Sequence, residues 1–230
     1  HLPCNDKDPL RKPFFGDTHV HTKDSLDAST QGTRTTPAQA YQFAQGERIG
    51  IQPWDKNGNA LRSLQLSRPL DFAMVTDHAE LMGEVTICNT PGMQGYKSWQ
   101  CRIYRHFPRI GYYLFNATAM SMKKRLGLCG DDGQHCIQSA SIPWQEMQQA
   151  AEDAYDRSEN CAFSSFVAFE WTGVSSTSEG AQNRHRNVIF RNAVVPALPI
   201  TAVEHPEAYQ LWDQLDEQCV APAKGCDVLV

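Results

Sequence analysis

The chain has 230 residues, of which 41% are hydrophobic and 20% charged, with a formal net charge of −5 at pH 7. These values predict a globular protein with a real core. The net charge argues against a groove that follows nucleic-acid phosphates, and no apolar run is long enough to span a bilayer. Because the chain begins with His rather than Met, we interpret it as processed, with any signal peptide already removed.

The cysteines predict disulfides and hence a periplasmic or secreted protein, because thiols are kept reduced in the cytosol. Six of the eight cysteines lie in close pairs within polar, loop-like sequence, and two remain. The pairs are Cys88 with Cys101, Cys129 with Cys136, and Cys219 with Cys226, leaving Cys4 and Cys161. Eight cysteines allow many connectivities, so the pairing of neighbours is a hypothesis.

The first predicted strand carries two histidines. Residues 1–13 form a polar N-terminal arm, and residues 14–22 form a strand with His19 and His21 near its end. Side chains two positions apart point to the same side of a strand, and converging imidazoles suit Zn²⁺ or a similar metal. An exposed strand in which His alternates with Val is the alternative.

A helix and a hairpin follow. Thr36 is a good N-cap and Pro37 a good first helical residue. The polar turn at 55–59 predicts a hairpin between strands 49–54 and 60–66.

The second core strand, 70–78, is almost continuously apolar, as expected for a parallel strand buried on both faces. It ends in Asp77 and His78. These residues are candidates for a site, or Asp77 is the N-cap of the next helix and His78 is exposed. Residues 83–145, rich in cysteine and aromatic side chains, are interpreted as an insertion that packs onto the core or binds a ligand. Residues 143–158 predict an amphipathic helix.

The third core strand, 166–171, contains Glu170 within an apolar run. An unpaired buried carboxylate costs several kcal/mol, so Glu170 needs a metal, a buried arginine or a proton. A loop at 173–180 precedes the fourth strand, 183–190, which His185 enters at its start.

The end of the chain predicts a helix at 207–218 and the beginning of a strand at 226–230. Because an apolar strand needs neighbours, we expect this chain to be a fragment or half of a split protein. The remaining strands would then lie on a companion chain. Strands that alternate with helices and end in polar residues predict an α/β barrel with its site where the strands terminate.

Four motifs together resemble the PHP (polymerase and histidinol phosphatase) superfamily, most closely an exported bacterial branch described as a domain of unknown function. The motifs are Gly16-Asp17-Thr18-His19-Val20-His21-Thr22, Val75-Thr76-Asp77-His78, Phe169-Glu170-Trp171, and His185 opening an apolar strand. The resemblance implies a distorted TIM-like (β/α)7 barrel, of which residues 14–230 form an incomplete N-terminal portion. It also implies up to three Zn²⁺, Mn²⁺ or Fe ions and the hydrolysis of phosphoesters.

The resemblance also assigns roles to individual residues. The implied metal ligands are His19, His21, Asp27, His78, Glu170 and His185, and Asp77 is an orienting or catalytic residue. Later ligands of the superfamily are absent from this sequence, and we expect them on the companion chain.

Two arginines are candidates for contact with the substrate. Arg184 and Arg186 can bind its phosphate, because guanidinium matches phosphate geometry, or they are surface residues that flank a strand.

The predicted function is therefore hydrolysis of a small phosphomonoester or phosphodiester by a metal-activated water in a site with two or three metals. Two alternatives remain open, namely a metal-dependent amide or lactone hydrolase and a non-catalytic exported metal-binding module.

Overall fold

The helix predicted to begin at Pro37 is confirmed. The computed structural model describes residue 5 and residues 10–177 and 180–230. In it the Thr36 side chain accepts a hydrogen bond from the backbone N–H of Gln39, whose side chain accepts one from the backbone N–H of Thr36. This capping box satisfies backbone donors at the start of the helix and fixes its first turn.

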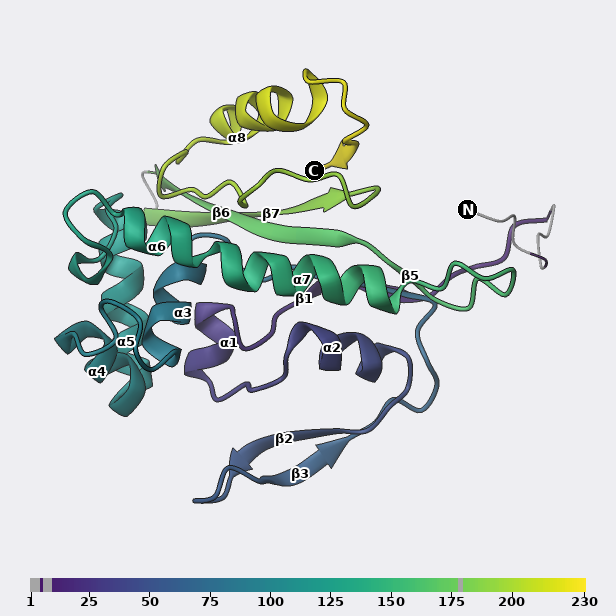
Figure 1. Ribbon diagram of the computed structural model, residues 1–230, viewed down its shortest axis with the longest axis horizontal. Coiled ribbons are helices and arrows are strands. Elements are labelled where there is room, and N and C mark those ends of the chain that lie inside the picture. The colour runs from purple at the N-terminus through teal and green to yellow at the C-terminus, as the bar shows by residue number, and fades with distance from the viewer. Residues whose placement is uncertain (1–4, 6–9, 178–179) are drawn as a thin grey trace.

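The helices and strands follow one another as Figure 1 shows. The α-helices are α1 (Leu26–Thr30), α2 (Pro37–Ala44), α3 (Met82–Asn89), α4 (Trp99–His106), α5 (Pro108–Asn116), α6 (Gln134–Ser139), α7 (Ser141–Ala154) and α8 (Ala208–Leu215). A π-helical turn follows α5 (Ala117–Ser121), another follows α8 (Asp216–Val220), and Gly127–Cys129 form a 3₁₀ turn. The strands are β1 (Gly16–Val20), β2 (Ile49–Trp54), β3 (Ala60–Leu64), β4 (Phe72–Val75), β5 (Ser164–Ser165), β6 (Val167–Thr177), β7 (Gly180–Phe190) and β8 (Val228–Leu229).

The strands form three small sheets. β1, β4 and β5 pair in parallel, β2 and β3 form the predicted antiparallel hairpin, and β6, β7 and β8 form an antiparallel sheet. The β2–β3 hairpin projects from one edge of the molecule, whereas α8 lies at the opposite edge beside β6 and β7 (Figure 1).

The predicted (β/α)7 barrel is wrong, because no sheet in the described part of the chain closes on itself. A barrel of this kind would pair its third and fourth core strands in parallel, yet they pair antiparallel, in register from Val167 opposite Phe190 to Thr177 opposite Gly180. A parallel pair needs a crossover of about a dozen residues or more, usually a helix, and the connection here is too short. The loop predicted at 173–180 is also wrong, because β6 continues to Thr177 and β7 begins at Gly180.

A seam of backbone contacts joins β6 to the end of β4. His78 and Glu170 form an isolated parallel bridge. The N–H of Glu170 donates to the carbonyl of Asp77 at 3.1 Å, and the N–H of Ala79 donates to the carbonyl of Glu170 at 2.9 Å. The seam therefore places the residues that follow β4 beside the middle of β6.

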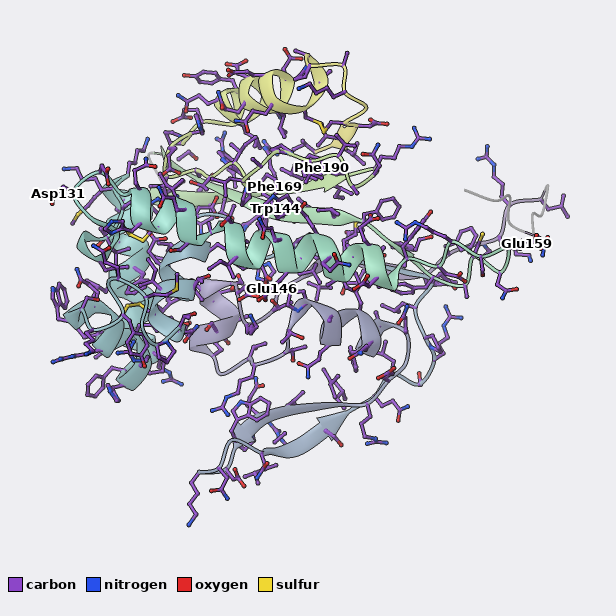
Figure 2. All side chains as sticks on the ribbon, in the orientation of Figure 1. Asp131, Trp144, Glu146, Glu159, Phe169 and Phe190 are labelled. Atoms are coloured by element: carbon purple, nitrogen blue, oxygen red, sulfur yellow. A yellow bond between two sulfur atoms is a disulfide. The ribbon has the colours of Figure 1, made fainter. Side chains whose placement is uncertain are left out.

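The core lies between α7 and the strands. Trp144 of α7 is fully buried against Phe169 of β6 and Phe190 of β7, with ring centroids 5.7 and 6.3 Å from its own (Figure 2). The helix predicted at 143–158 thus exists, although it begins at Ser141 and ends at Ala154. Its packing holds one face of the β6–β7 hairpin and leaves the other face available for a site.

Residues 83–145 contribute α3 to α6 and most of a second hydrophobic cluster. The three predicted neighbour pairs are confirmed as the disulfides Cys88–Cys101, Cys129–Cys136 and Cys219–Cys226. Cys4 lies outside the described residues. Within the described ranges, no helix combines the length and apolar character that a bilayer crossing requires.

Candidate metal centre

Glu170 is the centre of the candidate site. Alternation along β6 places its side chain on the face opposite Phe169 and Trp171, where it is fully buried. Four histidine rings surround the carboxylate instead of the arginine that was the alternative partner. Oε2 lies 2.8 Å from His21 Nε2, 3.3 Å from His19 Nε2 and 3.3 Å from His78 Nδ1, and Oε1 lies 2.5 Å from His185 Nδ1.

The first group that can hold a metal ion consists of His19, His21 and Glu170. The segment that ends β1 presents both Nε2 atoms, which are 3.0 Å apart, to Oε2 of Glu170. Atoms bound to one tetrahedral Zn²⁺ at 2.0–2.1 Å lie roughly 3.4 Å from one another. The distances between the two Nε2 atoms and Oε2 of Glu170 are close to this value.

The second group consists of His21, Asp27 and His78. Asp27 lies in the first turn of α1, and its two oxygens are 3.1 and 3.0 Å from Nδ1 of His21. The Ser25 hydroxyl donates to the same carboxylate at 2.5 Å. Asp27 therefore both orients His21 and is a possible ligand itself.

The third group consists of His78, Glu170 and His185. His185 lies opposite Thr172 in the β6–β7 ladder. The Thr172 hydroxyl lies 2.9 Å from Nδ1 of His78 and 3.1 Å from Nδ1 of His185, so it contacts both rings.

The structure thus brings together all six predicted ligands in three overlapping groups. We call this set, made up of His19, His21, Asp27, His78, Glu170 and His185, the ligand cluster. Its imidazole and carboxylate donors suit divalent transition metals.

The electrostatics of the ligand cluster favour a positive charge. Burial acts to lower the pKa of His21, but hydrogen bonds and charges of Asp27 and Glu170 outweigh it and raise the pKa to about 10. Burial lowers the pKa of His78 to about 4, which keeps that ring neutral. A proton on His21 supplies this positive charge in the chain alone, and a metal that binds deprotonated ligands would displace it.

Asp77 is fully buried, and both of its oxygens are engaged by Thr22. The N–H of Thr22 donates to Oδ1 at 2.5 Å and its hydroxyl donates to Oδ2 at 2.6 Å. Burial raises the pKa of Asp77 to about 7, against the hydrogen bonds from Thr22. These contacts tie the residue after His21 to the residue before His78.

The structure does not bring Arg184 and Arg186 to the ligand cluster. Both residues flank His185 on β7, and neighbouring side chains on a strand point to opposite faces. Arg186 accordingly lies over the ring of Trp212 in α8, with its guanidinium carbon 5.9 Å from the ring centroid.

Sequence reasoning missed Glu80, which is only 3% exposed. Its Oε1 accepts hydrogen bonds from the N–H groups of Thr172 and Ala202, whereas Oε2 lies 3.7 Å from His78 Nδ1 and has no hydrogen-bond partner. The sequence contains one hint, namely an acidic residue two positions after His78. The Glu80 side chain points toward the site, however, only because of the way the chain turns after β4.

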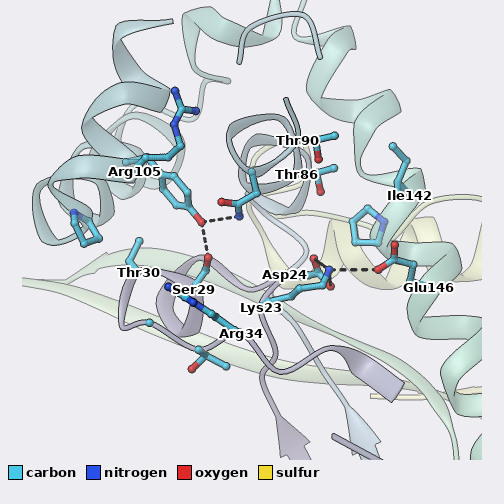
Figure 3. Close-up of a pocket in the computed structure, with 16 residues that line it drawn as sticks. Lys23, Asp24, Ser29, Thr30, Arg34, Thr86, Thr90, Arg105, Ile142 and Glu146 are labelled. Atoms are coloured by element: carbon cyan, nitrogen blue, oxygen red, sulfur yellow. Dashed lines mark hydrogen bonds and ion pairs between the residues drawn. The ribbon is translucent and has the colours of Figure 1, made fainter. Parts of the chain in front are cut away.

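Two cavities lie near this region. One, of about 320 Å³, is lined by Asp27, His78 and His185 of the ligand cluster. The other, of about 480 Å³, is lined by none of the six ligands (Figure 3). Its Lys23 is paired with Asp24 at 2.8 Å and Glu146 at 3.3 Å, so its cation is already neutralised.

A fourth group of possible ligands, Glu84 with Cys129 and Cys136, is excluded by its chemistry. The two cysteines form a disulfide, and a metal requires the thiolate. Glu84 instead pairs with Arg125 at 3.0 Å.

Comparison with known proteins identifies the family of this chain. No curated protein and no solved structure matches it. A family described as "Protein of unknown function (DUF3604)" matches residues 8–230, which is nearly the whole sequence, and the chain therefore belongs to this family.

Proposed function

We propose that the chain is a metal-dependent hydrolase of phosphoesters, related to the PHP superfamily that its motifs resemble. The buried carboxylate of Glu170, with imidazole nitrogens from four separate histidines within 3.3 Å, is the observation that carries this proposal. A purely structural role would not require such a concentration of metal-binding side chains around one buried acid.

The ligand cluster would hold two or three Zn²⁺, Mn²⁺ or Fe ions. Glu170 belongs to two of the three groups and offers a different oxygen to His185 than to His21, as a bridging carboxylate does. Bound divalent metals supply an acidified water and neutralise the oxygens of a phosphoryl group.

The chain contributes the orientation of the ligands. Asp27 fixes the ring of His21, Thr172 contacts the rings of His78 and His185, and Asp77 fixes the spacing between the first two motifs through Thr22. Such outer contacts set ring orientation and ligand basicity.

Arg184 and Arg186 are not expected to bind the phosphate, because their side chains point to the face of β7 opposite His185. The negative charge of the phosphoryl group would therefore be neutralised by metal ions at the ligand cluster. This requirement favours more than one metal.

We also propose that the protein works outside the cytoplasm, in the periplasm or after secretion. The three disulfides support this location, because they persist in an oxidising compartment.

Metal analysis combined with turnover of p-nitrophenyl phosphate and bis-p-nitrophenyl phosphate tests the function. We expect bound transition metal and hydrolysis that a chelator abolishes, and the ratio of the two rates separates monoesterase from diesterase. His78→Ala should abolish activity, whereas His106→Ala, which alters an exposed histidine of α4, should not.

Amide and lactone substrates in the same panel test the main alternative. Metal-loaded protein that hydrolyses these and leaves every phosphoester intact would contradict the proposal. Metal-loaded protein that is inert toward all of them would indicate a metal-binding module.

A further inference from the structure

We propose that the cavity of about 320 Å³ beside the ligand cluster binds the organic group of the substrate, and that this group is uncharged and aromatic. This inference rests on the proposed function, because it assigns the part of the ester that the metals do not bind. Among the cavities described above, this is the one that reaches the ligand cluster.

The position of the cavity supports this assignment. Asp27, His78 and His185 are at once ligands and part of its wall. A phosphoryl group held at the ligand cluster therefore has its ester substituent directed either to solvent or into this cavity. The apolar part of the wall favours the cavity, because contact with it removes apolar surface of the substituent from water.

The walls are suited to a flat, apolar group. One wall is formed by α5 and the π-helical turn after it, which contribute Tyr112, Tyr113 and Met120. Val174 of β6 and Leu81 add aliphatic surface. Aromatic rings stack favourably on tyrosine faces, and the methionine thioether adapts to their edges.

The charges of the lining disfavour a second anionic group. No lysine or arginine occurs among the described residues that line the cavity, whereas Asp27 is acidic. A carboxylate or second phosphate on the far side of the substituent, away from the metals, would meet no lysine or arginine to pair with it, which is costly. An uncharged group meets no such penalty.

The unpartnered oxygen of Glu80 is a second indication that the cavity receives a ligand. Its carboxyl group is almost fully buried and lines the cavity, yet Oε2 has no hydrogen-bond partner in the protein. Buried polar atoms without partners are rare in native proteins. A hydroxyl on the substrate, which both donates and accepts, would satisfy Glu80.

The size of the cavity limits the group to a small one. Pockets for small molecules range over about 300–1,000 Å³, so this cavity is near the lower end. It fits a single ring system and not an oligomer.

Isothermal titration calorimetry of Zn²⁺-loaded protein tests this inference without depending on turnover. Phenylphosphonate and 3-phosphonopropionate share a phosphonate but carry an aromatic ring and a carboxylate, respectively. We expect phenylphosphonate to bind at least about tenfold more tightly, as ring stacking and burial predict.

Two matched variants locate the effect. Ala117→Phe fills the cavity from the turn after α5 and should weaken phenylphosphonate by about tenfold while leaving methylphosphonate unchanged. Thr90→Phe adds the same side chain to the wall of the cavity of about 480 Å³ and should change neither.

The outcomes separate this inference from the proposed function. Equal binding of the two phosphonates, binding of neither, or an Ala117→Phe variant that binds like wild type would overturn the cavity assignment. Turnover of p-nitrophenyl phosphate, measured in parallel, decides the proposed function. Selective phenylphosphonate binding without turnover would support the cavity as a ligand site and contradict the proposed hydrolase activity.

Discussion

Thr172 and His185 face each other across the β6–β7 ladder, and the Thr172 hydroxyl contacts not only this histidine but also His78, which follows β4. One hydroxyl group thus links an imidazole of β7 to one in the segment that follows β4. The separation in sequence between Thr172 and His78 is 94 residues. The orientation of both rings therefore depends on Thr172, which is not itself one of the candidate metal ligands.

Replacing this hydroxyl should weaken metal binding. We expect Thr172→Val to lower the affinity for Zn²⁺ by about 10–100-fold, as is typical when an outer contact of a metal ligand is lost. Competition with a fluorescent chelator measures the affinity. Thr172→Ser retains the hydroxyl and should bind metal like wild type; equal affinity in the valine variant would show that Thr172 does not orient the ligands.

Two isosteric substitutions should remove different numbers of metal ions. Glu170→Gln disables the two groups that contain Glu170 and leaves only His21, Asp27 and His78. Asp27→Asn disables that last group and leaves the other two. Metal content per chain, measured by mass spectrometry after dialysis, should therefore fall further in Glu170→Gln than in Asp27→Asn. The reverse order would contradict Glu170 as the shared ligand.

The stability of chelated protein should depend on the ionisation of Asp77. Its pKa rises from 3.8 to about 7 on folding, chiefly because of burial, so its ionised form opposes folding and its contribution to stability declines as pH rises through this range. Asp77→Asn stays neutral and can keep both contacts with Thr22, its oxygen accepting and its amide donating.

The free energy of unfolding, measured in urea between about pH 4 and pH 8, checks this expectation. The Asn variant should gain stability relative to wild type as pH increases and hold a constant advantage above pH 7. A difference between the two proteins that does not change with pH would mean that Asp77 has an ordinary pKa.

Arg125 should be important for stability. Its guanidinium pairs with the fully buried Glu84 at 3.0 Å and with Glu204 at 2.8 Å. Arg125→Met leaves Glu84 without its cation, and we expect a loss of about 3–5 kcal/mol in the free energy of unfolding. Adding Glu84→Gln removes the unpaired charge and should restore part of this loss. A double variant no more stable than the single one would refute the explanation.

The ligand cluster was largely predictable because its residues occupy simple positions on strands. His19 and His21 lie two apart, and His78 follows an apolar strand, so alternation and strand ends make a common site a candidate beside the alternative of exposed histidines. Glu170 was conspicuous as an acid in an apolar run. Asp27 depended on the resemblance to PHP proteins, since its place in a short helix carries no local signal.

The sheet arrangement was less predictable. Strand periodicity does not distinguish a parallel neighbour from an antiparallel one, and only the short connection between β6 and β7 excludes a crossover helix. The same alternation that identified His19 with His21 also places Arg184 and Arg186 on the opposite face from His185.

Glu80, Thr172 and the cavity walls depend on packing between distant segments. Tyr112 belongs to the region interpreted as an insertion, yet it lines a cavity together with residues of β6 and β7. No pattern within either segment specifies their contact, because it arises only when the second hydrophobic cluster positions α5.

The seam between β4 and β6 has a consequence for local opening. The amide protons of Glu170 and Ala79 are hydrogen-bonded across it, so they exchange with deuterium only when the two sheets separate. A cation shared by His21 on one side and Glu170 on the other must leave before the sheets part. Deuterium uptake at these two amides should therefore slow as free metal increases, whereas the β2–β3 hairpin, which lacks ligand-cluster residues, should take up deuterium at the same rate throughout.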